Sequence, residues 1–162
     1  MRHQNNDFNP IGATVLGMHD ALVSLTGLIA GIAFTIPHRR DIILTAIIAS
    51  ITAALSMAAS NYLAARAGNI SCALRTGALT GAAYMITCIF LILPFCVTSN
   101  RGLALCATFA IAIIIIFAFN FIVGNIQRKS WWRNAIEMFL VCATISGAAF
   151  IIGRAAEYFL GI

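Results

Sequence analysis

Apolar residues in this chain occur in five long runs separated by short polar segments. The runs cover residues 11–36, 42–65, 76–97, 103–124 and 135–160. Each is long enough to cross a bilayer as a helix, because about 20 mainly apolar residues span the roughly 30 Å hydrocarbon core. The connections are short, so sequential helices must be antiparallel neighbours. The pattern predicts an all-α integral membrane bundle of five transmembrane helices, with residues 1–162 forming a single transmembrane domain.

Composition excludes a soluble globular protein. Apolar residues make up 61% of the chain and charged residues 9%, against roughly 45–50% and about 25% in soluble domains. The net charge of +5 is spread over all the connections in runs of at most two basic residues. We therefore interpret the basic residues as signals that flank the spans and set their orientation in a lipid bilayer, and not as a nucleic-acid site.

Basic residues also predict the orientation. With five crossings the two termini lie on opposite sides, and a cytoplasmic N-terminus places six basic residues inside and four outside. The inside set is Arg2, Arg66, Arg75, Arg128, Lys129 and Arg133, and the outside set is Arg39, Arg40, Arg101 and Arg154. The positive-inside rule thus favours a cytoplasmic N-terminus and a C-terminus outside. The polar start of the chain does not resemble a signal peptide, so we expect the first span to remain in the mature protein.

Sequence motifs of catalysis are missing. The chain has no HExxH, GxSxG or phosphate-binding loop, and its five cysteines never occur at CxxC spacing. We interpret the cysteines as small packing residues. The protein is expected not to be an enzyme and to hold no cofactor.

Asp20 is the most informative polar residue because it lies well inside the first apolar run. A charge at the middle of a membrane helix costs about 2.5–3.5 kcal/mol on insertion scales, so an acid there is by default a functional hypothesis. The alternative is a protonated or hydrogen-bonded residue that only fixes packing. Ser24 follows one helical turn later on the same face, and His19 precedes Asp20 on a different face. His19 is a candidate for the pathway, or else a histidine hydrogen-bonded between helices.

The second apolar run offers a soft ligand at a similar depth. Met57 and Asn61 share a helix face that Ser50 extends. A thioether beside the Asp20 carboxylate suits a borderline transition metal such as Fe(II) and suits Mg²⁺ or Ca²⁺ poorly. We therefore predict Asp20 and Met57 as metal ligands, with His19, Ser24, Ser50 and Asn61 as pathway-lining candidates. Packing is the alternative for a methionine in such a helix.

Two further features concern contacts. GxxxG motifs at Gly27 and Gly31 and at residues 77 and 81 predict close helix packing, either within one protomer or across a dimer. Glu137 begins the last run next to basic residues, where an ion pair with Arg133 is the simplest interpretation.

The segments GMHDALVSLTGLIAG (17–31) and AALSMAASNYLAAR (53–66) resemble the vacuolar iron transporter family. The stretches GALTGAAYMITCIFLILPF and RNAIEMFLVCATISGAAFIIG are also similar. The resemblance implies a five-helix bundle that forms a homodimer and carries Fe(II) or Mn(II) out of the cytosol in exchange for protons. It also implies a path at the dimer interface, metal ligation by Asp20 and Met57, and a place in a bacterial inner membrane.

Some features depart from the family pattern. Ser50 stands where many members have a glutamate, and Ser60-Asn61 replaces Gly-Glu or Gly-Gly. The connection of about residues 66–75 lacks the Glu-rich hairpin that gathers metal in well-known members. These departures keep open an alternative function, a membrane scaffold or regulatory partner that retains the fold without transport.

Overall fold

Five α-helices account for nearly all of the residues that the computed structural model describes, which are 9–127 and 131–160. The helices are α1 (Pro10–Ile32), α2 (Arg39–Ala67), α3 (Ala73–Val97), α4 (Arg101–Gln127) and α5 (Trp131–Leu160). Each is long and apolar enough to cross a membrane, and the described ranges contain no strand. The predicted all-α bundle of five membrane helices is confirmed, and the chain is an integral membrane protein.

Local sequence explains where the first helix begins and ends. The side chain of Asn9 accepts a hydrogen bond from the backbone N–H of Gly12 at 2.9 Å, and Pro10 occupies the first helical turn. The helix ends at Ile32, four residues before the end predicted from hydropathy. Pro37 disfavours helical backbone in the residue before it, and residues 33–35 form turns and residue 36 a bend although three of these four residues are apolar. Other helix ends lie up to four residues beyond the apolar runs, because polar flanks can complete a terminal turn.

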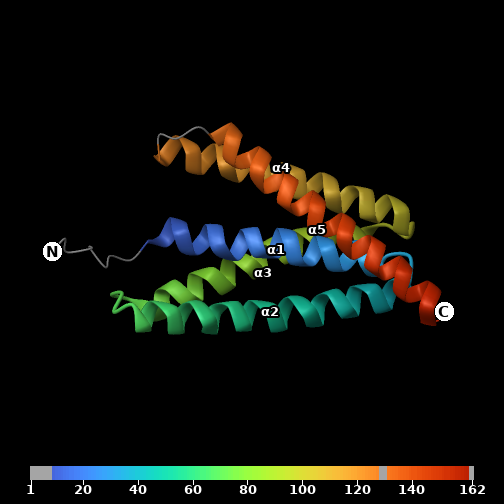
Figure 1. The fold of residues 1–162 in the computed structure, drawn as a ribbon, viewed down its shortest axis with the longest axis horizontal. Helices are drawn as coiled ribbons and strands as arrows, with labels where there is room; N and C mark the ends of the chain where they lie inside the picture. Colours follow the sequence, from blue (N-terminus) through green and yellow to red (C-terminus); the bar gives the residue numbers. More distant parts are fainter. Residues whose placement is uncertain (1–8, 128–130, 161–162) are drawn as a thin grey trace.

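Helix α1 is the central element of the bundle. It packs against all four other helices, while α2 packs mainly on α3. Figure 1 shows α2 along one side of the bundle and α4 along the opposite side, with α1 between them. The beginning of α1 and the end of α5 lie at opposite ends of the molecule (Figure 1). Residues of α1 therefore contact several other helices. A site built from several helices is expected at this central helix.

Small residues on α1 and α3 allow the closest helix approaches. A Cβ placed on Gly17 would lie 2.1 Å from the backbone oxygen of Thr80. A Cβ on Gly77 would lie 2.5 Å from the backbone oxygen of Ala58. Atoms never approach this closely, so these two positions of the α1–α3 and α2–α3 seams admit only glycine without a shift of the helices.

The first GxxxG motif also packs within the protomer. A Cβ on Gly31 would lie 3.2 Å from the backbone oxygen of Ala149 in α5, and a Cβ on Gly153 would lie 2.5 Å from the backbone oxygen of Gly31. The sequence left open whether the glycine motifs pack within one protomer or across a dimer. The structure assigns both motifs to contacts inside a single chain.

Two arginines tie the connections together at the end of the bundle away from the start of α1. Arg101 donates a hydrogen bond to the backbone oxygen of Ile36 at 2.9 Å, and Arg39 donates one to the backbone oxygen of Thr98 at 3.1 Å. Each arginine begins one helix and caps carbonyl groups that follow another. These two arginines are half of the basic residues that the sequence analysis placed outside. They also hold the α1–α2 and α3–α4 connections side by side.

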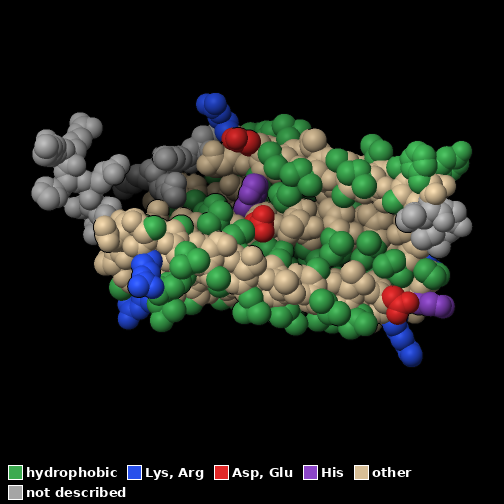
Figure 2. All heavy atoms as spheres, turned by 60° about the horizontal axis from the view of Figure 1, so that its bottom comes forward, with side chains coloured by type: hydrophobic (Ala, Val, Ile, Leu, Met, Phe, Trp, Pro, Cys, Tyr) green, Lys and Arg blue, Asp and Glu red, His purple; other side chains and the backbone are tan. Residues whose placement is uncertain are grey.

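Many large apolar side chains lie on the surface of the described bundle. Leu22 and Leu91 are fully buried, whereas Leu55 and Ile151 on the outside are 67% and 68% exposed. Figure 2 shows apolar side chains spread along the whole length of one face, with few charged groups among them. Such a surface is stable when lipid covers it, since hydrocarbon is as apolar as leucine.

Candidate functional site

Asp20 lies in the middle of α1 and is only partly buried. At 1.5 Å per residue it is about 15 Å along the helix from Pro10. Its carboxylate interacts electrostatically with His19, and among the described residues it forms no ion pair with lysine or arginine. A carboxylate at this depth needs a polar or watered surrounding, because lipid cannot solvate it.

The first polar neighbours of Asp20 come from its own helix and from α3. Ser24, one turn after Asp20, hydrogen-bonds through its hydroxyl to the hydroxyl of Tyr84 at 2.7 Å. Tyr84 is 2% exposed, and its hydroxyl lies close enough to Asp20 for an electrostatic interaction. Because Ser24 itself is exposed, this hydrogen bond links the accessible side of α1 to the interior of the bundle.

The same polar chain continues to α2. Cys88, one turn after Tyr84, is buried close to Tyr84 and Ser50 and interacts electrostatically with Asp20. Ser50 donates to the backbone oxygen of Ala46 at 2.6 Å and is 2% exposed. The structure thus brings three of the predicted residues, Asp20, Ser24 and Ser50, into one cluster completed by α3.

Tyr84 and Cys88 were missed by the sequence analysis. Their signal was the spacing of hydrogen-bonding residues in the third apolar run, where Thr80, Tyr84 and Cys88 recur every four residues. In an α-helix this spacing places all three on one face. A tyrosine and a cysteine in an apolar run look like packing residues until a neighbouring helix supplies their partners.

Met57 and Asn61 lie on the side of α2 near α3. Asn61 donates from its side-chain nitrogen to the hydroxyl of Thr80 at 2.5 Å, and Thr80 in turn donates to the backbone oxygen of Thr76 at 2.9 Å. Met57 is partly buried, one turn before Asn61. No hydrogen bond or pocket in the described part of the chain joins Met57 to Asp20. Their joint role as ligands stays a prediction.

His19 lies close to Asp20 and also borders a pocket. It lines a pocket between α1, α4 and α5, together with Glu137. Figure 2 shows a histidine and an acidic side chain next to each other near the middle of one face, with a second acidic side chain above them. The hydrogen bond between helices that was the alternative for His19 is not formed with any described residue.

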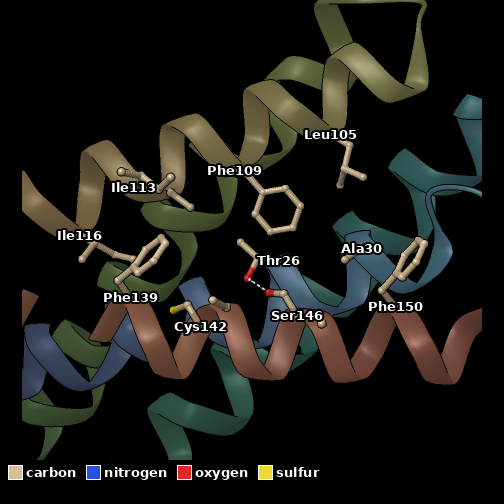
Figure 3. A pocket seen from close by; sticks show the side chains of 13 residues that line it. Thr26, Ala30, Leu105, Phe109, Ile113, Ile116, Phe139, Cys142, Ser146 and Phe150 are labelled. Atoms are coloured by element: carbon tan, nitrogen blue, oxygen red, sulfur yellow. Dashed lines mark hydrogen bonds between the residues drawn. The ribbon is translucent and has the colours of Figure 1, made fainter. Parts of the chain in front are cut away.

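A larger pocket in the same part of the bundle has no ligand chemistry. It measures about 430 Å³ and lies between α1, α4 and α5, lined almost wholly by apolar side chains. Figure 3 shows Phe109 above a hydrogen bond between Thr26 and Ser146, with Phe139 to the left beside Ile116. That bond measures 3.1 Å, and Thr26 also donates to the backbone oxygen of Leu22. With both hydroxyls engaged and no charge, this pocket does not suit a metal ion.

Comparison with protein-family models gives a match that covers the two segments on which the predicted resemblance rests. Residues 11–73 match the family model described as the VIT family, and these residues include α1, α2, Asp20 and Met57. No curated protein sequence matches the chain. Members of the VIT family are transporters and not enzymes, and five apolar helices fit a metal transporter in general. The match therefore confirms the predicted resemblance: residues 11–73 of this membrane protein are similar in sequence to the VIT family.

Proposed function

We propose that the protein is a homodimeric transporter that moves Fe(II), or Mn(II), out of the cytosol across a bacterial inner membrane in exchange for protons. The observation that carries the proposal is Asp20, a carboxylate in mid-span with no described ion-pair partner. An ionisable group in this position has to face a watered path or a protein partner.

The position of this carboxylate supports the proposed dimer. Asp20 is partly buried and Ser24 is exposed, so both are accessible on the outside of a single protomer. Lipid would leave Asp20 unsolvated, whereas a second copy of the chain would cover it and double the number of carboxylates along the shared surface. Two such carboxylates together with Met57 from each copy would offer hard and soft ligands to a borderline divalent metal.

Protons have titratable groups available beside the proposed metal ligand. Asp20 and His19 are neighbours in the middle of α1 and can both change their charge during a transport cycle. A carboxylate that binds a divalent cation must be deprotonated, so metal binding and proton release are coupled. We assign His19 as the next candidate for proton coupling after Asp20.

The test is uptake of ferrous iron into proteoliposomes with an imposed proton gradient. We expect metal flux well above that of empty vesicles, accompanied by proton movement in the opposite direction. Asp20→Asn should abolish the flux while the protein remains a folded dimer in detergent, since the amide keeps the shape and loses the charge. Met57→Ala should leave partial flux with a changed metal preference. Asp41→Asn, which removes an exposed carboxylate at the start of α2, is the matched control and should transport normally.

The scaffold function is the second candidate. It is favoured by the hydrogen bonds of two residues that stand where many family members have acidic residues. Ser50 and Asn61 are engaged in hydrogen bonds inside the bundle, with Ala46 and Thr80. These two positions contribute to packing and supply no carboxylate for a metal or a proton. A stable copurifying partner, with unchanged cellular metal after deletion of the gene, would support the scaffold. Iron sensitivity of the deletion strain would exclude it.

A further inference from the structure

The pocket that His19 and Glu137 line lies between α1, α4 and α5, apart from the Asp20, Tyr84 and Cys88 cluster. It measures about 330 Å³ and is walled on its other sides by apolar side chains. The lining residues that carry possible donor atoms for a cation are His19, Asn120, Asn134, Glu137 and Met138. They come from three helices, so the folded bundle assembles a donor set that no single span contains.

The hydrogen bonds of Asn120 leave its oxygen free to act as a ligand. The side-chain nitrogen of Asn120 donates to the backbone oxygen of Ile116 at 2.8 Å and approaches the sulfur of Met138 at 3.3 Å. Both bonds use the nitrogen, which fixes the orientation of the amide. The carbonyl oxygen has no partner among the described residues and can accept a cation.

Glu137 supplies the negative charge of the pocket. The sequence predicted an ion pair between Glu137 and Arg133, and this prediction is wrong: the two side chains form no ion pair in the structure, and Glu137 lines the pocket with His19. Both residues are exposed near the start of α5, where water can keep them apart. Glu137 and His19 thus line the same pocket, and neither side chain forms a hydrogen bond with a described residue, so both can bind a cation.

We propose that this pocket binds a divalent transition-metal cation through the Glu137 carboxylate and the His19 imidazole, with Asn120 and Asn134 supplying amide oxygens. Imidazole with carboxylate and carbonyl oxygen is a donor set that suits Mn(II) and Fe(II). The identity of the ion rests on the proposed transport function, but the binding site itself does not. Since His19 and Asp20 are adjacent in α1, a cation held here is one residue away from the proposed transport site.

The experiment is a titration of the full chain in detergent with Mn(II), in which loss of the free-ion electron paramagnetic resonance signal reports binding. Asp20→Asn is the background, because it removes the other proposed site. We expect this variant to keep a saturable Mn(II) site. Adding Glu137→Gln or His19→Gln should raise the dissociation constant about ten-fold or more, since loss of supporting groups alone costs that much at metal sites. Nitrogen modulation of the spin echo should vanish with His19→Gln.

Further variants separate ligation from general effects. Val141→Phe adds bulk to the lining without removing a ligand and should also weaken binding. Asp41→Asn and His38→Gln remove the same side-chain types from exposed positions at the other end of the bundle and should bind as the background does. The proposal is overturned if Asp20→Asn abolishes all saturable binding, or if the Glu137 and His19 variants bind as tightly as the background.

The outcomes also distinguish this inference from the proposed function. Saturable binding that depends on Glu137 and His19, in a protein without iron flux in vesicles, would retain the site and reject the transporter. Flux that depends on Asp20, in a protein whose pocket binds no Mn(II), would retain the transporter and reject the site.

Discussion

Replacing Gly17 with alanine tests how closely α1 and α3 approach beside the candidate site. The added Cβ would lie 2.1 Å from the backbone oxygen of Thr80, whereas real Cβ atoms keep at least 3.0 Å. Because a backbone oxygen in a helix cannot rotate away, the two helices must separate by about 0.9 Å at this point. Overpacking of this kind costs about 1–3 kcal/mol of unfolding free energy.

A matched variant removes the contribution of helix propensity. Glycine inside a helix is about 0.5–1 kcal/mol less favourable than alanine. Gly147 also lies within a helix, and a Cβ there would meet nothing within 4 Å. Gly147→Ala should therefore stabilise the protein by about 0.5–1 kcal/mol. The propensity gain is common to both variants, so the difference between them isolates the overpacking cost of about 1–3 kcal/mol.

Unfolding in mixed micelles of increasing dodecyl sulfate, followed by far-ultraviolet circular dichroism, measures both variants. The Gly17 variant should unfold at lower dodecyl sulfate than the Gly147 variant, and its transport should fall because Asp20 lies one turn away on the same helix. Equal unfolding midpoints would refute the close approach of α1 and α3, and with it the position of Tyr84 relative to Ser24.

Two more predictions concern hydrogen bonds between helices. Tyr84→Phe removes the hydroxyl that bonds Ser24, so we expect a loss of about 0.5–1.5 kcal/mol in the same unfolding assay and slower iron flux, with the oligomeric state unchanged; wild-type stability together with wild-type flux would contradict the role of this bond. Arg101→Gln removes the donor to the backbone oxygen of Ile36, so amide hydrogen exchange should accelerate in residues 33–36 and stay unchanged around Gly68 at the other end of α2. Unchanged exchange in residues 33–36 would mean that this arginine does not hold the connection in place.

Sequence alone determined the number of spans because bilayer thickness imposes a minimum length on each apolar run. Five runs bounded by polar residues predict five helices, and the structure has them. Hydropathy predicted the helix ends less accurately, because it measures the free energy of placing side chains in lipid and not the backbone geometry. The early end of the first helix before Pro37 is an example. Asp20 was identified for the same energetic reason, since an acid in a span is costly wherever the other helices lie.

Tertiary structure decided which residues surround that acid. Tyr84 and Cys88 of α3 lie near Asp20 because Gly17 lets α3 approach α1 closely, and Ser50 of α2 lies near Cys88. Such contacts depend on the rotation of each helix about its axis. The sequence does not define this rotation when a helix is apolar on every face, because any of its faces can then contact lipid. The same freedom hid the pocket of Glu137 and His19, residues 118 positions apart. Spacing along the chain predicts neighbours within a helix, whereas a site shared by several helices is defined only by the way they pack.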